Sequence, residues 1–486
     1  MSKGEKKSLG LITGDEVQYH DGSAIIIPRG MTYDRAFEIL EHMYRSQETI
    51  EELEPEIFPF RPNDVAVAVA RVVQRRYGLS FGLGQRSFFT EEPPSFKSVP
   101  VSLTERVEVA TGRIALPTLD NAEIRVGETL HPQYGLVGAV NCEMKRKDRS
   151  HVRELLKDIQ EELRTNSIYK GKALRIVGNK AEPEFMDVDR FPTWDDIVYK
   201  AEARAALEGS VLIPLRKHER MAREGVPFRR STLLTGPYGT GKTSFGQLAA
   251  REAVNCGVTA IFSDAGADIN VLFQTARLYQ PALVFIEDID VYTSSGEDEK
   301  VSKFLDIFDG VHAKTAEVMV IMTTNHVERI HRGLLRPGRV DAVIEIDHLD
   351  RHGVEKLIRQ TVGNALADDV DFDAIYEAMD AYTPAFIADA IKRAKVHAIG
   401  RSADDEEIKL TTEDLIGAAA QLRGQHNLMR RATEGQRKPS FERALSDVVA
   451  GAAAKAVNGA ALRKGGGTDG PQIATVVIQN GEEVAV

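Results

Sequence analysis

The glycine-rich stretch from Gly236 to Thr243 is the feature that most constrains the fold of this chain. It reads Gly-Pro-Tyr-Gly-Thr-Gly-Lys-Thr and matches the pattern G-x-x-x-x-G-K-[ST]. In this pattern backbone N–H groups surround phosphates, the lysine reaches the β- and γ-phosphates, and the final hydroxyl ligates Mg²⁺. An apolar run, Ser231–Thr235, precedes the loop and a helix-compatible segment follows it, so the phosphates would lie at a helix N-terminus. We therefore predict a nucleotide site in a strand–loop–helix unit.

The segments after this loop alternate between uniformly apolar runs and helical patterns. Strands this apolar, separated by helices, indicate a parallel sheet that helices cover on both faces, so we predict an α/β core. The expected strands are Val258–Phe262, Ala282–Ile286 and Val318–Met322, and the expected helices are Asn270–Leu278 and Val301–Phe308. Upstream, Thr193–Asp196 resembles a capping box and predicts the start of another helix.

The length of the chain, 486 residues, predicts about three domains at roughly 150 residues each. Helical spacing predicts amphipathic helices at 31–54 and 64–77, and the strands and helix that follow indicate an α+β domain with a last strand at 173–177. The stretch 178–190 is expected to be a linker. The expected domains are an N-terminal helical region (1–95), an α+β domain (96–180), the α/β core (190–348), a helical lid (349–430) and a flexible tail with a terminal β-hairpin (431–486).

Charge and cysteine content narrow the class of protein. The 62 basic and 73 acidic residues give a net charge of −11, which argues against a protein built mainly to hold a nucleic-acid backbone. Cys142 and Cys256 form neither a disulfide framework nor a metal knuckle. We find no apolar run of signal-peptide or transmembrane length, so we expect a cytoplasmic protein without a membrane segment.

Polar side chains follow two of the expected strands. Glu287 and Asp288 come directly after Ala282–Ile286, and Asn325 follows Val318–Met322 after two threonines. Because ligands of parallel sheets bind at the carboxyl ends of the strands, these carboxylates can face Thr243 and its metal ion. The amide of Asn325 is suited to hold an attacking water or the γ-phosphate.

Residues 333–341 read Gly-Leu-Leu-Arg-Pro-Gly-Arg-Val-Asp. Together with the loop and the strand ends, they resemble the AAA+ ATPases, and more narrowly the AAA clade proper. The resemblance covers about 191–423, where four motifs occur in the order of that family. It implies an ATP hydrolase that uses ATP and Mg²⁺ and assembles into a homo-oligomeric ring, a hexamer or a heptamer.

The resemblance assigns roles to individual residues. Thr243 and Glu287 would hold the metal ion, Asp288 takes the position of the catalytic base, and Asn325 matches the first sensor. Arg336 and Arg339 match arginine fingers that act on the ATP of the neighbouring subunit, a role that suits a planar, always-charged guanidinium. Phe308–Gly310 resembles the intersubunit signalling segment, and Thr383–Ala385 falls where the lid approaches the nucleotide. The nucleotide-binding residues would be Gly236, Pro237, Tyr238, Gly239, Thr240, Gly241, Lys242, Thr243 and Ser244.

The chain departs from most of the clade in two places. The strand ends in Glu287-Asp288, where most relatives have Asp-Glu, and the segment 263–272 is short and lacks the aromatic pore residue of many relatives. Both departures resemble the mitochondrial Rieske-protein translocase branch, which moves folded protein. The membrane helix of that branch is not present in this sequence. The resemblance therefore supports ATP hydrolysis more firmly than the threading of an unfolded chain.

We therefore expect a ring-forming ATPase that remodels, disassembles or translocates a protein substrate. The sequence contains no H-E-x-x-H metalloprotease motif. A nucleic-acid motor or loader remains a less favoured alternative, which stimulation by DNA or RNA and a steep salt dependence would reveal. A third alternative is an ATP-dependent scaffold with little turnover, suggested by the inverted Glu287-Asp288 pair.

Overall fold

The computed structural model describes residues 30–78, 96–116, 118–119, 122–264, 266–293, 304–306, 308, 316–331, 333–334, 336, 339–402 and 407–430. It also gives the backbone of a few short strands and of the end of the last helix. Contacts divide the chain into two compact units, Met1–Ala420 and Gln421–Val486. The site described below lies within the first of them.

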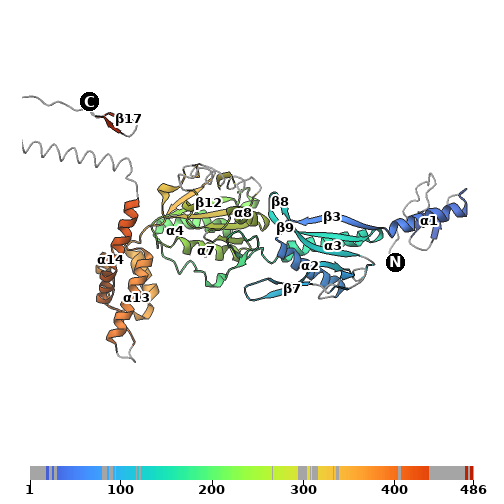
Figure 1. Cartoon of the computed structure of the whole chain (residues 1–486). Helices are drawn as coiled ribbons and strands as arrows, with labels where there is room; N and C mark the ends of the chain where they lie inside the picture. The colour runs from blue at the N-terminus through green and yellow to red at the C-terminus, as the bar shows by residue number, and fades with distance from the viewer. Residues whose placement is uncertain are drawn as a thin grey trace, which may run out of the picture. The chain divides into compact units, whose positions relative to one another are not determined.

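The N-terminal part of the first unit is an antiparallel sheet with helices on it (Figure 1). Its five strands run in the order β3-β9-β8-β7-β6, with α2 and α3 packed against them. Valines of α2, including Val65 and Val72, meet Leu155 and Ile159 of α3 in one buried cluster. The elements are α1 (Tyr33–Gln47), β3 (Ile50–Phe58), α2 (Pro62–Tyr77), β6 (Ser95–Pro100), β7 (Arg106–Ala115), β8 (Glu123–His131), β9 (Gly135–Lys145) and α3 (Arg149–Asn166). Short strand pairs are β1 (Gln18–His20) with β2 (Ala24–Ile26) and β4 (Gln85–Arg86) with β5 (Glu91–Glu92).

The first predicted helix is too long at its C-terminal end. The helix α1 ends at Gln47, and Ile50 already pairs with Lys145 as the first residue of β3. Pairing with β9 overrides the local helical pattern, because each residue of the segment gains a partner in the ladder. Consequently β3 and α2, predicted within the helical region 1–95, share one sheet and one core with strands of the α+β domain predicted at 96–180.

The second sheet carries the glycine-rich loop and confirms the predicted α/β fold class. Its seven strands run in the order β11-β10-β13-β14-β15-β12-β16, and every neighbouring pair except β11-β10 is parallel. The strands are β10 (Ala173–Ile176), β11 (Glu184–Phe185), β12 (Arg230–Thr235), β13 (Thr259–Ser263), β14 (Ala282–Ile286), β15 (Val318–Thr324) and β16 (Ala342–Glu345).

Helices cover both faces of this sheet, as alternate strand residues show. Leu233 and Val284 belong to a cluster that includes α8, whereas Leu234 and Phe285 belong to a separate cluster that includes α7. The two-residue period of a strand therefore directs neighbouring side chains into two different cores. The helices of this part are α4 (Ala201–Leu207), α5 (Ile213–Arg216), α6 (His218–Arg223), α7 (Lys242–Asn255), α8 (Ile269–Leu278) and α9 (Asp290–Thr293).

The strand expected at 173–177 is present, but not in the domain to which the sequence assigned it. As β10 it pairs in parallel with β13 of the second sheet, with Leu174 opposite Ile261. Leu174 and Ile176 are fully buried, which a strand covered on both faces requires. The predicted linker, 178–190, contains β11, which pairs with β10 and extends the sheet.

The helix predicted to begin at Thr193 does not form there. Thr193 donates from its backbone N–H and its hydroxyl to Asp196, at 2.7 and 2.6 Å, as in a cap. The chain nevertheless continues in an irregular conformation up to α4, which begins at Ala201. Burial of Ile197, Val198 and Tyr199 explains the difference, because these side chains pack into the core from an irregular backbone.

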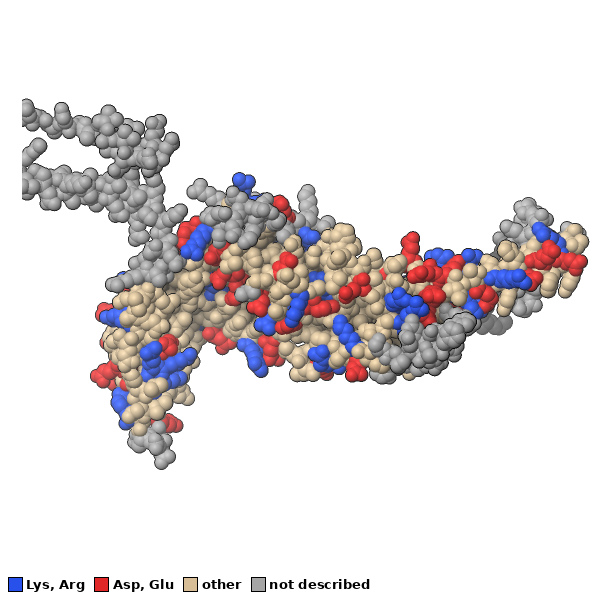
Figure 2. Space-filling model, in the orientation of Figure 1, with Lys and Arg blue, Asp and Glu red and all other residues tan. Residues whose placement is uncertain are grey.

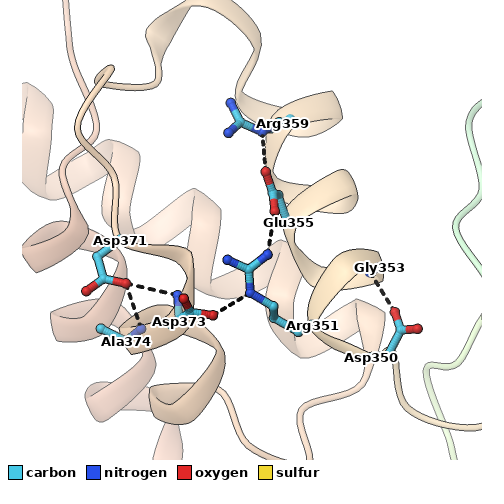
Figure 3. A network of polar contacts seen from close by, with 8 residues as sticks. All are labelled: Asp350, Arg351, Gly353, Glu355, Arg359, Asp371, Asp373 and Ala374. Atoms are coloured by element: carbon cyan, nitrogen blue, oxygen red, sulfur yellow. Dashed lines mark hydrogen bonds and ion pairs between the residues drawn. The ribbon is translucent and has the colours of Figure 1, made fainter.

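The lid begins with α11 (Arg351–Val362), α12 (Phe372–Ala378) and α13 (Pro384–Arg401), and α14 (Thr412–Gln436) follows. Figure 3 shows how α11 and α12 are tied together: Arg351 of α11 pairs with Asp373 of α12 and with Glu355, which also binds Arg359. Both helices also start at an aspartate cap, Asp350 and Asp371. The ion pair between Arg351 and Asp373 thus links the two helices, while the other ion pairs and the caps stabilise each helix separately.

Near the C-terminal end, two short antiparallel strands, β17 (Val477–Gln479) and β18 (Glu482–Val484), flank Asn480-Gly481. In the part of the chain that the structure describes, no helix combines the length and apolarity needed to span a bilayer.

Candidate functional site

A cavity of about 510 Å³ lies at the carboxyl ends of the central strands of the second sheet. This volume is in the range of small-ligand sites, roughly 300–1,000 Å³. The glycine-rich loop, the ends of β14 and β15, an irregular segment before α4 and the lid all contribute to its wall. The lining residues are Asp196, Ile197, Val198, Tyr238, Gly239, Thr240, Gly241, Lys242, Thr243, Ser244, Glu287, Asp288, Thr323, Asn325, Leu357, Pro384 and Ala385.

The backbone of the loop requires glycine at its turns. Gly236, Gly239 and Gly241 have φ values of 138°, 78° and 96°, in the region that side chains disfavour. At Gly236 a Cβ would also come within 2.0 Å of the carbonyl oxygen of Ile346. The helix α7 starts at Lys242, so the loop leads its amides into a helix N-terminus.

Lys242 is buried at the base of the loop. Its Nζ donates to the carbonyl oxygens of Gly236 and Pro237, at 2.8 and 2.7 Å. Burial lowers the pKa of Lys242 to about 8, and the nearby Asp288 opposes this shift. An anionic ligand in the cavity would favour the charged form of the lysine, because opposite charges attract strongly in a partly dehydrated site.

Asp288 combines an unusual backbone with a defined hydrogen-bond environment. Its φ of 47° is left-handed, its N–H donates to the hydroxyl of Thr323 at 3.1 Å, and its Oδ1 accepts from Nδ2 of Asn325 at 2.9 Å. Burial, followed by the charge of Asp290, raises the pKa of Asp288, while Lys242 and His326 oppose the rise. A carboxylate made more basic in this way is suited to accept a proton.

Thr243 and Glu287 present oxygen atoms to the same cavity. Both residues are exposed, and within the described part of the chain neither side chain has a hydrogen-bond partner. A hydroxyl and a carboxylate with unused lone pairs are the ligands that Mg²⁺ prefers. The two residues therefore fit the metal ion that the sequence predicted for them.

The lid contacts the loop directly. The N–H of Ala385, in the first turn of α13, donates to the carbonyl oxygen of Gly239 at 3.1 Å. A Cβ on Gly239 would lie only 2.8 Å from the Cβ of Ala385. The Thr383 hydroxyl is buried beside this contact, and the residues that the structure describes offer it no hydrogen-bond partner. The position of the lid is thus coupled to the conformation of the loop.

The predicted arginine fingers lie apart from this cavity. Neither Arg336 nor Arg339 lines it. Arg339 donates to the carbonyl oxygen of Gly333 at 2.8 Å, and Arg336 is exposed. Phe308, the first residue of the predicted signalling segment, is buried in the α8-side core, whereas Asp309 and Gly310 lie outside the described residues, as do Pro337 and Gly338.

Some lining residues were not found from the sequence. Ile197 and Val198 contribute an apolar wall, and Leu357 of α11 adds another apolar side chain. Tyr199 lies just outside and donates to the carbonyl oxygen of Gly241 at 2.8 Å, so it supports the loop from behind. The capping-box pattern predicted a helix in this segment, whereas the structure has an irregular backbone that lines the cavity.

Residues 232–348 match the model of the ATPase family associated with various cellular activities (AAA). The chain carries an AAA+ ATPase domain. It is 31% identical over 234 residues to Protein SAV of Sulfolobus acidocaldarius, covering 45% of this chain and 30% of that protein. It is 30% identical to the ATP-dependent zinc metalloprotease FtsH 2 of Sphaerobacter thermophilus, covering 51% and 40%. With Proteasome-activating nucleotidase 2 of Haloferax volcanii the identity is 30%, covering 49% and 64%.

These alignments cover less than two thirds of each of these relatives. What they share with this chain includes the ATPase domain, and they confirm the predicted AAA+ family. The N-terminal sheet lies outside the residues that match the family model.

Proposed function

We propose that this protein is a ring-forming ATPase that couples ATP hydrolysis to the remodelling, disassembly or translocation of a protein substrate. The observation that carries this proposal is the convergence on one cavity of the glycine-rich loop, the Asp288–Asn325 pair and the lid. Each of these parts comes from a different element, so a ligand that binds there contacts all of them.

The lining of the cavity suits both the base and the phosphates of ATP. Ile197, Val198 and Leu357 offer apolar surface to the base. In our proposal the loop amides and Lys242 bind the phosphates, and Thr243 with Glu287 would hold Mg²⁺. The metal ion would supply positive charge that neutralises the phosphates.

Hydrolysis requires a water that attacks the γ-phosphorus while the bond to the bridging oxygen of the β-phosphate breaks. In our proposal the carboxylate of Asp288 accepts a proton of this water and Asn325 helps to fix its position. The hydrogen bond between the two side chains, 2.9 Å long, keeps them at one place in the cavity. Negative charge that spreads over the γ-phosphate in the transition state needs a further cation.

That cation would come from Arg336 or Arg339 of a neighbouring copy. Support comes from the position of both residues outside the cavity of their own chain. A head-to-tail contact that places one surface on a different surface of the next copy generates a closed ring, for which we propose a hexamer or a heptamer.

A protein substrate is favoured over nucleic acid. Two of the relatives are named for work on proteins, a metalloprotease and a proteasome-activating nucleotidase. Figure 2 shows lysines and arginines interspersed with aspartates and glutamates on the face in view, without a broad basic track. Non-specific nucleic-acid binding relies on such a track.

Steady-state ATP hydrolysis by the purified protein tests the proposal, with Lys242→Ala as the comparison. The wild-type protein should hydrolyse ATP, and Lys242→Ala should weaken ATP binding about 100-fold because a charge-assisted contact to phosphate is lost. Turnover should rise with the protein client and stay unchanged with DNA or RNA. Absence of turnover in the wild type, with ATP binding intact, would instead support a scaffold.

A further inference from the structure

A tyrosine of the glycine-rich loop is bound to a buried histidine at the end of the neighbouring strand. The hydroxyl of Tyr238 lies 3.2 Å from Nε2 of His326, and the two rings meet edge to face at 5.9 Å. His326 follows Asn325 directly and is only 5% exposed, whereas Tyr238 is 46% exposed and lines the cavity. The contact therefore joins the loop to the strand end that carries Asn325.

The partners of His326 set the direction of these hydrogen bonds. Its other ring nitrogen, Nδ1, lies 3.3 Å from Oε1 of Glu328, and an ionised carboxylate can only accept. In the neutral imidazole, Nδ1 must then carry the proton and Nε2 must accept. In that tautomer the hydroxyl of Tyr238 donates to His326, and the two contacts fix the orientation of the imidazole ring.

Asn325 directly precedes His326 at the end of β15, and its amide donates to Oδ1 of Asp288 at 2.9 Å. The backbone N–H of His326 donates to the hydroxyl of Thr324 at 2.9 Å, so this short turn is also bonded to itself. A contact that fixes the ring of His326 therefore also restrains the neighbouring Asn325.

We propose that Tyr238, oriented by His326 and Glu328, is a positioning residue that fixes the amide of Asn325. With its NH₂ bonded to Asp288 and its backbone restrained at His326, Asn325 keeps Oδ1 as an acceptor for the attacking water. The second oxygen of Asp288 is the other acceptor. A water that donates to both would be oriented with its lone pair toward the γ-phosphate.

This inference rests on the proposed ATP hydrolysis and adds a residue to it. Without the Tyr238 hydroxyl, the ring of His326 loses one of its two bonded partners, so the adjacent Asn325 is less restrained and can move away from Asp288. Binding of ATP relies on the loop backbone and on Lys242, which keep their geometry. The loss should therefore appear in kcat and leave KM unchanged.

The substitution Tyr238→Phe removes the hydroxyl and keeps the ring. We expect kcat to fall about 10-fold and KM for ATP to stay within about 2-fold, as for the loss of one hydrogen bond used in the transition state. The matched control is Tyr376→Phe on α12, since in the described part of the chain the Tyr376 hydroxyl has no hydrogen-bond partner. This control should keep the wild-type kcat.

A double-mutant cycle separates positioning from packing. The side chain of Glu328 is 38% exposed, so Glu328→Ala can be made without disturbing a core. It frees the histidine to change tautomer and should lower kcat about 3-fold, but it should add nothing in the Tyr238→Phe background.

Equal kcat for Tyr238→Phe and the wild type would overturn the inference, as would independent, multiplying effects of the two substitutions. If the wild-type protein itself shows no turnover, the proposed function fails and not this inference alone. Measuring the wild type beside Tyr238→Phe, Tyr376→Phe, Glu328→Ala and the double variant distinguishes failure of this inference from failure of the proposed function.

Discussion

Two regions of the first unit place charged side chains in opposite settings. One is the seam between the N-terminal sheet and the nucleotide-binding sheet, which we define by Arg61, Asp64, Glu182 and Tyr279. The other is the ATP cleft around Lys242 and Asp288. In the seam, Arg61, Asp64 and Tyr279 are buried, Glu182 is partly buried, and all four are bonded within the chain, whereas carboxylates of the cleft are exposed and retain unused oxygens. The seam groups stabilise the fold, and the exposed carboxylates of the cleft can bind a ligand.

Arg61 illustrates the seam. It is fully buried, and its guanidinium donates to the carbonyl oxygen of Leu136 at 2.8 Å and to the hydroxyl of Thr275, on α8, at 2.5 Å. Its backbone N–H donates to the hydroxyl of Tyr279 at 3.0 Å, and among the described residues Nε has no hydrogen-bond partner. The side chain therefore links α8 of the nucleotide-binding sheet to β9 of the N-terminal sheet.

The carboxylates of the seam are bonded as well. Asp64 accepts from the hydroxyl of Ser167 at 2.6 Å and from the N–H of Ile168 at 3.0 Å. Glu182 accepts from the N–H of Asn63 at 2.8 Å and from the hydroxyl of Tyr169 at 2.9 Å. Because both carboxylates accept hydrogen bonds from the chain itself, we assign this network a structural role.

The largest effect is expected in the cleft. Asp288→Asn should lower kcat by about 10²–10⁴-fold, the usual contribution of a general base, and should retain bound ATP. Single-turnover hydrolysis with a filter-binding assay measures both. If Glu287→Gln traps ATP with Mg²⁺ binding intact and Asp288→Asn does not, the roles that we give to the two carboxylates are reversed.

In the seam, Arg61→Ala should lower the free energy of unfolding by about 3–5 kcal/mol, because several buried acceptors lose their donor. Urea titration measures this change. The control is Arg61→Met, which keeps most of the buried volume and should be less destabilising. A loss of ATP affinity in Arg61→Met without a loss of stability would contradict a purely structural seam.

The seam should also make stability depend on pH. Burial raises the pKa of Asp64 to about 6 from its ordinary value of 3.8. As the pH rises from about 4 to 6, the unfolded chain loses this proton before the folded chain does, so folding should lose about 3 kcal/mol from this group. Asp64→Asn should remove that part of the dependence. Identical pH profiles of the wild type and the variant would show that Asp64 is not the source.

A smaller effect is expected where the lid meets the loop. Gly239→Ala adds a Cβ at a φ of 78°, only 2.8 Å from Ala385, and should weaken ATP binding about 10-fold through strain and displacement of the lid. Gly257→Ala is the matched control, because its φ is 75° but nothing lies within 4 Å of the added atom. Titration calorimetry with ATP should show a loss only for Gly239→Ala.

The cleft could be predicted from the sequence and the seam could not, for a physical reason. The loop and the strand ends, such as Gly236–Thr243 and Asp288, have their chemistry encoded locally, in runs of a few residues. The partners of Arg61 are 75 to 218 residues away along the chain, so no local pattern shows them. The same limit applies to β10, whose place beside β13 depends on a distant partner.

Local signals also failed where tertiary contacts compete with them. Thr193 does form the hydrogen bond to Asp196 that its capping pattern predicts. The backbone after it is nevertheless not helical, because Ile197 and Tyr199 are buried in the core. Similarly, Ile50 has helical spacing with α1 but pairs in β3. The role of His326 was missed because its partners, Tyr238 and Glu328, come together only in the fold.

The central claim is a composite ATP site, with the cleft of one copy completed by arginines of the next. It is tested most directly by mixing two variants that are each inactive, Arg336→Ala/Arg339→Ala and Asp288→Asn, and measuring ATP hydrolysis. We predict that the mixture regains activity, because some interfaces then combine an intact Asp288 with intact arginines. A mixture as inactive as its components, or full activity of the double arginine variant alone, would contradict the account.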